Sequence, residues 1–300
     1  MSAACRLLAK IIMRNRLSVF FDKNAKTIEK NAFLFREINT RCFDRLELIK
    51  LDPHLILDLG AGVGSANAYF QQRYFNSICL ALDISHAVLL KNTANHRVQA
   101  NVEHLPLQAA SIDLVYSNLL LHWQSDLGAA LTEVKRVLSP KGLFLFSCFG
   151  VETLKELRAA FARVDAQWFA GESLNHLNHF YDMHDIGDGL VTLGFADPVM
   201  DMEIISVEYP DLQTLLLDIK TIYGPCVLAN RPIKYLGKQY FERVEQCYRE
   251  LIGSDKALSV SFEVIYGHAW QAPTRIGYGL NDQGEVAVPV SAINTKSKNR

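Results

Sequence analysis

A cluster of three glycines is the feature of this 300-residue sequence that most clearly suggests chemistry. It reads Asp58-Leu59-Gly60-Ala61-Gly62-Val63-Gly64-Ser65 and lies between a short apolar stretch and a predicted helix. Glycines at such a turn let the backbone approach a ligand closely, and the helix start offers free N–H groups to an anion. A dinucleotide fingerprint G-x-G-x-x-G would need glycine at position 65, where serine stands. The cluster predicts a ligand-binding loop, with a plain tight turn as the alternative.

An acidic residue, Asp83, ends the next predicted strand about 20 residues downstream, where a carboxylate can accept hydrogen bonds from a ribose diol. The alternative is a solvated or helix-capping aspartate. Ligands of open α/β sheets bind at the carboxyl ends of the strands, so residues that follow successive strands should meet in one crevice. The residues expected around a bound nucleoside are Asp58, Gly60, Gly62, Gly64, Asp83, Ile84, Asn101, Val102 and Asn118.

The elements that would position these residues alternate between strand and helix. Buried strands are predicted at 55–60, 77–85, 96–102, 111–121 and 142–150, with a helix over 24–51 and another over Asp126–Leu138. Such βαβ units form a parallel sheet with helices on both faces, because the crossovers are right-handed. The fold class is therefore α/β, with a doubly wound, mostly parallel, Rossmann-like sheet.

The pattern changes after Gly150, where strands at 202–209 and 258–270 enclose two helical stretches. We expect an N-terminal helical segment at 1–50, a ligand-binding domain at 51–210, a helical insertion at 211–257, a last sheet strand at 258–272 and a partly mobile tail at 273–300. The insertion is the expected lid. Its apolar faces could equally form an extra layer or an oligomer contact, so the oligomeric state stays open.

The composition excludes several classes of protein. Lys plus Arg (31) nearly balances Asp plus Glu (32), so no overall field favours nucleic acid or anionic lipid. No apolar run reaches the 18 or more residues that would span a bilayer. The six cysteines form no C-x-x-C pair and lack histidines at zinc-ligand spacing, which predicts no metal and a reducing, cytoplasmic compartment.

The first 21 residues are basic, with Arg6, Lys10, Arg14 and Arg16 and no acidic residue before Asp22. We interpret them as a basic helix that could line a site for an acidic partner. The alternative is a mitochondrial transit peptide, whose composition is similar.

The motifs at 50–150 together resemble those of the class I S-adenosylmethionine-dependent methyltransferases. DLGAGVG looks like the first motif of that family, LDIS like the second, and VEHLPLQAASIDLVYSNLLLHW and VLSPKGLFLFSCFG like the later ones. The resemblance implies a seven-stranded sheet and S-adenosyl-L-methionine as the cofactor. Asn101 departs from the family, which usually has an aspartate that accepts from the adenine amino group; the asparagine carbonyl can still accept.

The resemblance points to a narrower family when the segments FFDKNAKTIEKNA, HLNHFYDMHDIGDGL and SFEVIYGHAW are included. Over 20–272 the sequence resembles the malonyl-acyl-carrier-protein O-methyltransferases of biotin synthesis. The resemblance implies methyl transfer to the free carboxylate of a malonyl thioester on acyl carrier protein, or on coenzyme A. Ile28 stands where this family usually has a tyrosine beside the active site.

The implied reaction needs no catalytic acid or base, because a carboxylate is already ionised near neutral pH. Alignment of the reactants and exclusion of water should supply most of the catalysis. The candidate substrate residues are His122, Trp123 and His176, with structural roles as the alternatives. An acidic carrier protein would need a local basic surface. Candidates for it are Lys23, Lys26 and Lys30 near the N-terminus and Lys234, Lys238, Arg243 and Arg249 in the insertion.

Two other functions compete with this one. A mitochondrial complex I assembly factor resembles the family and is associated with arginine hydroxylation, and the basic N-terminus would favour it. A non-catalytic cofactor-binding scaffold is favoured by the departures at Asn101 and Ile28, whereas the intact glycines and Asp83 argue against a dead site.

Overall fold

The computed structural model describes residues 3–30, 33–124, 126–169, 174, 176–178, 180–222, 236–253 and 257–272. The elements, in chain order, are α1 (Ala3–Lys30), α2 (Phe33–Glu47), β1 (Leu55–Leu59), α3 (Asn67–Arg73), β2 (Ile78–Asp83), α4 (His86–Leu89), β3 (His96–Gln99), β4 (Ile112–Asn118), the 3₁₀ turn η1 (Leu121–Trp123), α5 (Leu127–Val137), β5 (Leu138–Phe149), α6 (Lys155–Trp168), α7 (Met183–Thr192), β6 (Ala196–Tyr209), α8 (Leu212–Ile222), α9 (Lys238–Ile252) and β7 (Leu258–Trp270). The predicted tail at 273–300 and part of the predicted insertion, 223–235 and 254–256, lie outside the described residues.

The described strands form one seven-stranded sheet in the order β3-β2-β1-β4-β5-β7-β6. β1 pairs in parallel with β2 on one side and β4 on the other, and β7 runs antiparallel to both β5 and β6. The strand order reverses between β1 and β4, which is the switch point where ligands of such sheets bind. The predicted doubly wound, mostly parallel sheet is confirmed.

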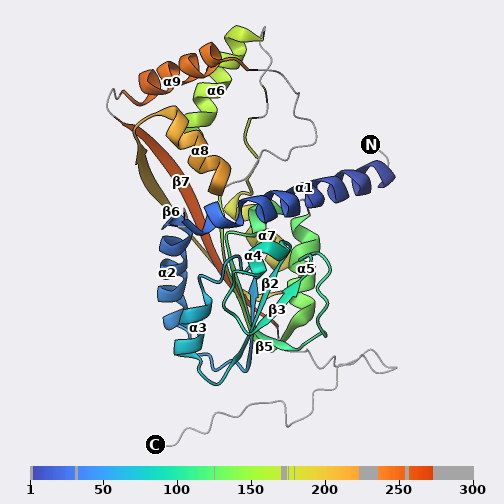
Figure 1. Ribbon diagram of the computed structural model, residues 1–300. Helices are drawn as coiled ribbons and strands as arrows, with labels where there is room; N and C mark the ends of the chain where they lie inside the picture. Colours follow the sequence, from blue (N-terminus) through green and yellow to red (C-terminus); the bar gives the residue numbers. More distant parts are fainter. Residues whose placement is uncertain are drawn as a thin grey trace, which may run out of the picture.

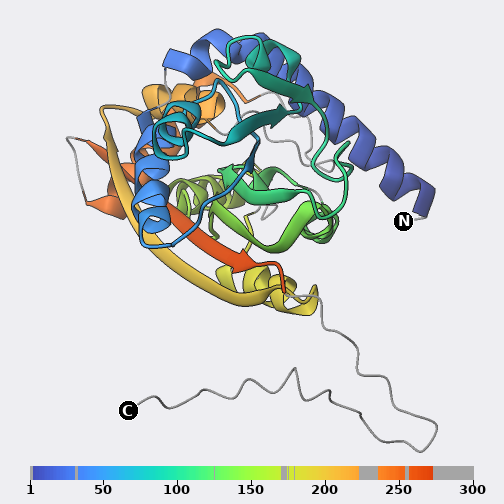
Figure 2. The same ribbon diagram turned by 90° about the horizontal axis from the view of Figure 1, so that it is seen from below.

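Alternating side chains of the central strands build a core on each face of the sheet. Leu143 and Leu145 of β5 belong to the apolar cluster that includes α2 and α3, whereas Phe144 and Phe146 belong to the cluster with α5 and α7. This period of two is what a strand covered on both faces requires. The view from below shows α2 and α3 on one side of the central strands and α5 on the other (Figure 2).

Helices α6, α8 and α9 pack beside the long strands β6 and β7 at one end of the molecule (Figure 1). The buried side chains of α9, Tyr240 and Val244 among them, share one apolar cluster with Phe161 of α6 and Phe262 of β7. The segment predicted as an insertion therefore contributes α8 and α9 to a helical layer at this end of the sheet.

The predicted helix over 24–51 is wrong in its boundaries, because its first residues belong to α1, which begins at Ala3, and α2 begins at Phe33. α1 crosses the sheet end and contacts α4, while α2 packs on β4 and β5 (Figure 1). Asp22 fixes α1 in place: its Oδ1 accepts from Ser85 Oγ (2.5 Å) and from the Ala87 N–H (3.0 Å). Periodicity alone missed this change of direction because no glycine or proline marks it.

Candidate active site

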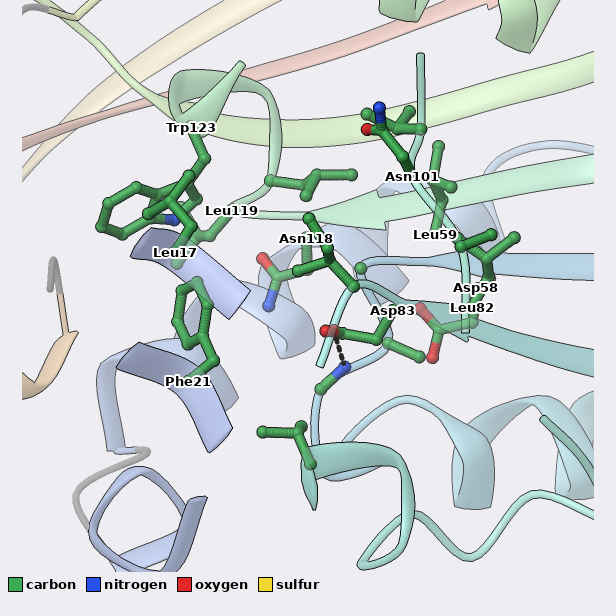
Figure 3. A pocket seen from close by; sticks show the side chains of 18 of the residues that line it. Leu17, Phe21, Asp58, Leu59, Leu82, Asp83, Asn101, Asn118, Leu119 and Trp123 are labelled. Carbon is green, nitrogen blue, oxygen red and sulfur yellow. Dashed lines mark hydrogen bonds between the residues drawn. The ribbon is translucent and has the colours of Figure 1, made fainter. Parts of the chain in front are cut away.

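A cavity lies at the carboxyl ends of the parallel strands, under α1 (Figure 3). Its wall includes the loop after β1, the ends of β2 and β4, the segment after β3, and residues of α1 and α2. Eight of the predicted ligand residues line it, namely Asp58, Gly60, Gly62, Asp83, Ile84, Asn101, Val102 and Asn118. The structure thus brings strand ends that are distant in sequence to one place, as the switch-point rule requires.

The ninth predicted residue, Gly64, is not among the lining residues and shapes the loop instead. Its φ of +89° lies in the left-handed region, and a Cβ there would come within 2.8 Å of Asn92 Oδ1. Asn92 in turn donates to the Gly62 carbonyl (3.0 Å) and accepts from the Ala94 N–H (2.8 Å). A side chain at position 64 would therefore push apart the loop and the segment that braces it.

Asp83 is held with both carboxylate oxygens oriented by backbone donors. Oδ2 accepts from the Gly62 N–H (3.0 Å) and Oδ1 from the Ser85 N–H (2.9 Å). Burial raises the pKa of this carboxyl group, and the backbone hydrogen bonds oppose that effect. A carboxylate has about four acceptor positions, so the backbone donors leave room for a ribose hydroxyl. The geometry fits the predicted role of Asp83.

Asp58 lies deeper in the same wall, only 3% exposed. Burial is the main reason that its pKa rises to about 7, and the nearby Asp83 carboxylate adds to the shift. A carboxylate with so little water around it is stabilised by a cation. Two acids next to each other in a cavity therefore favour a ligand that carries positive charge, as the sulfonium and ammonium groups of S-adenosyl-L-methionine do.

The two ends of the Asn101 amide differ in their surroundings. Its Oδ1 accepts from the Glu103 N–H (3.3 Å), while Nδ2 is buried and has no hydrogen-bond partner among the described residues. A buried donor without a partner is unfavourable by roughly 1–3 kcal/mol, so it points to a ligand acceptor. The amide oxygen keeps a second acceptor position, so the contact to the adenine amino group stays a prediction, and Nδ2 offers a donor beside it.

Two asparagines tie α2 to the floor of the cavity. Asn39 donates to Ser65 Oγ of the glycine loop (2.6 Å) and accepts from the Tyr116 hydroxyl of β4 (2.5 Å). Asn118 donates to the Phe35 carbonyl (3.1 Å) and accepts from Ser147 Oγ of β5 (2.6 Å). Asn118 lines the cavity, as expected, with its side chain held by its neighbours.

The cover of the cavity is α1, for which the sequence pointed to Arg14 and Ile28 but not to Leu17 or Phe21. Arg14, Leu17, Phe21 and Ile28 of α1 line the cavity, and Phe21 packs edge-on against Trp123 with ring centroids 5.6 Å apart. Intervals of three, four and seven place these side chains on one helix face, which is the signal that could have found them. None of the described residues of the expected lid, at 211–257, is part of the lining.

The three candidate substrate residues are separated by the structure. Trp123 lines the cavity, while His122 lies behind it among Trp123, Phe149 and Phe180, at centroid distances of 5.2, 4.9 and 5.8 Å. Burial lowers the pKa of His122 to about 3, so its ring is neutral.

His176 is not among the lining residues and joins a polar cluster between α6 and α9. Its Nε2 lies 3.0 Å from Asp165 Oδ2 and 3.0 Å from the Tyr240 hydroxyl, which donates to Asp165 Oδ1 (2.5 Å). Within the described part of the chain, His176 therefore connects two helices and does not face the cavity. Its type and position could not show this, because the partners lie far away in sequence.

Comparison with known proteins agrees with this site. Residues 57–146 match a family model described as a methyltransferase domain. A protein of Methylovorus sp. (strain MP688) named malonyl-[acyl-carrier protein] O-methyltransferase is 40% identical over 281 residues, covering 89% of this chain and 92% of its own. A protein of the same name from Gallionella capsiferriformans (strain ES-2) is 38% identical, covering 89% and 93%.

A solved structure supports the fold. Phosphoethanolamine N-methyltransferase 2 of Haemonchus contortus, in complex with S-adenosyl-L-methionine, matches with a TM-score of 0.52 at 13% identity, covering 85% of this chain and 60% of that one. These comparisons give no support to the hydroxylase, scaffold or mitochondrial alternatives. The cavity, the methyltransferase fold and the extent of the sequence identity together show that this chain belongs to the family of malonyl-[acyl-carrier protein] O-methyltransferases.

Proposed function

We propose that this chain transfers a methyl group from S-adenosyl-L-methionine to the free carboxylate of a malonyl thioester carried by acyl carrier protein, the step that starts pimeloyl assembly in biotin synthesis. The observation that carries the proposal is the cavity in which Asp83, the glycine loop and the unpaired Asn101 amide meet under α1. The names of the curated relatives supply the substrate class.

When bound, the cofactor supplies an electrophilic methyl group on a positively charged sulfur. Transfer of that methyl group to a malonyl oxygen would leave the sulfur electron pair on S-adenosylhomocysteine and give a methyl ester, and no proton would move. The chain therefore needs no acid or base, and we assign no residue to such a role.

The chain's own contribution is to align the two reactants and keep water out. Asp83 and the backbone of the glycine loop would hold the nucleoside, while Asn39 and Asn118 fix the floor through their hydrogen bonds. Leu17 and Phe21 with Trp123 form an apolar wall beside it. A carboxylate that leaves water beside such a wall is a stronger nucleophile, and orientation alone can supply roughly 7–11 kcal/mol.

A mass-spectrometric assay tests the proposal. Purified protein is mixed with S-adenosyl-L-methionine and malonyl-loaded acyl carrier protein, and we expect one methyl group to be gained on the malonyl arm. An Asp83→Ala variant should bind the cofactor at least about 100-fold more weakly and, at the same cofactor concentration, show no detectable methyl transfer. Cofactor binding by the unaltered protein without any methyl gain would contradict the proposal, and parallel runs with malonyl-coenzyme A would show which carrier is used.

We also propose that the reaction takes place in the cytoplasm. The curated relatives are bacterial, and Cys42, Cys148 and Cys247 are buried free thiols, which suits a reducing compartment. In the part of the chain that the structure describes, no helix combines the length and apolar character needed to cross a bilayer.

A further inference from the structure

The outer face of α1 is cationic. Arg16, Lys23 and Lys26 of this face are exposed, as is Arg14 at its edge, and none of them takes part in an ion pair within the described residues. The one acidic residue between Arg14 and Ile28 is Asp22, and its carboxylate points inward to Ser85 and Ala87 at the start of α4. The exposed charge of this helix face is therefore of a single sign.

The other candidate basic surface comprises Lys234, which lies outside the described residues, and three cations of α9 that are paired with glutamates of the same helix. Lys238 pairs with Glu242 (3.2 Å) and Arg249 with Glu245 (2.6 Å). Arg243 lies 3.7 Å from Glu250, which Arg163 of α6 also approaches to 3.7 Å. Cations already paired with carboxylates offer little to an acidic partner. The structure thus favours the basic surface of α1 over that of α9, whereas the sequence did not distinguish between them.

The cationic face is also continuous with the active site. Arg14 is exposed and at the same time lines the cavity, and Leu17, Phe21 and Ile28 on the inner face of the same helix line it too. From Arg14 to Lys26 the helix extends about 18 Å at about 1.5 Å per residue, enough to lie along a helix of a partner. A carrier protein docked here would hold its malonyl arm at the edge of the cavity.

We infer that the outer face of α1, formed by Arg16, Lys23 and Lys26 with Arg14 at its edge toward the cavity, is the docking surface for the acidic carrier protein that presents the malonyl group. The inference rests on the proposed function and adds the place where the partner binds. With a formal net charge of −1, the chain has no overall attraction for an acidic protein, so a local patch must provide it.

The test compares two triple variants that remove the same number of positive charges. Arg16→Gln/Lys23→Gln/Lys26→Gln alters the docking face and spares Arg14, which lines the cavity. Lys155→Gln/Arg163→Gln/Lys238→Gln is the matched control, because these exposed cations are paired with Glu152, Glu250 and Glu242. The readouts are binding of malonyl-loaded carrier protein by titration calorimetry at low and high salt, and turnover of malonyl-pantetheine, which lacks the carrier.

We expect the α1 variant to bind the carrier about 5- to 50-fold more weakly at low salt and to lose most of the salt dependence, because rim charges act through long-range attraction. The control variant should stay within about twofold of the unaltered protein. Turnover of malonyl-pantetheine should be the same in all three proteins, since the cavity is unchanged.

Carrier binding that is unchanged in the α1 variant, or equally weakened in the control, would overturn the inference. Failure of the unaltered protein to bind the carrier while it sediments with phosphatidylglycerol vesicles would also overturn it and assign the face to a membrane. If the carrier binds as expected but no methyl group is transferred, the proposed function fails while the docking surface stands.

Discussion

Replacing Asp58 with asparagine should stabilise the folded protein in a pH-dependent way. An aspartate in an unfolded chain has a pKa of about 3.9, whereas burial and the neighbouring Asp83 raise the pKa of Asp58 to about 7 in the fold. The folded state therefore holds the proton more tightly than the unfolded state does. Stability that is present below about pH 4 is lost as the pH rises to about 7.

The magnitude follows from the pKa difference. At about 1.4 kcal/mol for each tenfold difference in proton affinity, the penalty above pH 7 is on the order of 4 kcal/mol. The asparagine at position 58 carries no charge, so the variant does not have this penalty. Urea unfolding should therefore give equal free energies for the two proteins near pH 4 and a growing advantage for Asp58→Asn up to pH 8.

Asp113 provides a control, because the change in stability on its replacement should depend on pH in the opposite direction. Asp113 accepts hydrogen bonds from the His54 and Leu55 N–H groups and from Ser139 Oγ, and these bonds lower its pKa. Asp113→Asn should therefore be less stable than the unaltered protein at neutral pH, with the difference shrinking as the pH falls. A constant difference between Asp58→Asn and the unaltered protein from pH 4 to pH 8 would refute the reasoning.

The same titration should govern cofactor binding. If the cationic cofactor binds only when Asp58 is ionised, its affinity should rise about tenfold between pH 6 and pH 8 for a pKa near 7. Calorimetric titration with S-adenosyl-L-methionine should show this rise and the release of a proton on binding at pH 6. Asp58→Asn should bind more weakly and lose the pH dependence.

Three further changes have defined outcomes. Asp83→Ala should weaken S-adenosyl-L-methionine binding by two orders of magnitude or more, since charged hydrogen bonds contribute about 1.5–3 kcal/mol each; a calorimetric affinity within tenfold would contradict this. Asp22→Ala should free α1 from α4 and speed protease cleavage within α1, and the cleavage rate should not change if the anchor is unimportant. Tyr240→Phe should lower unfolding stability by about 1–3 kcal/mol, because Asp165 loses a buried donor, and an unchanged urea midpoint would disprove that role.

Local patterns predicted the sheet and the cavity well. The strand ending at Asp83, the glycine turn and the parallel order follow from apolar runs and turn residues that each element carries in its own sequence. The convergence of Asp58, Asp83 and Asn118 then follows from topology, because parallel strands end at one edge.

Features that depend on distant partners could not be predicted in this way. His176 has the residue type of a substrate contact, yet its ring is held by Asp165 of α6 and Tyr240 of α9. The hydrogen bond that Asn101 accepts from the Glu103 N–H is likewise a product of the local fold, which the residue type does not reveal. The role of each of these polar side chains depends on which other groups the fold brings within hydrogen-bond distance.

Ser85 links the nucleoside site to its cover. Its N–H donates to Asp83, its hydroxyl donates to Asp22 of α1, and the same oxygen accepts from the Val88 N–H. The orientation of Asp83 and the anchor of α1 therefore share one residue, so a substitution that displaces Ser85 should disturb both at once.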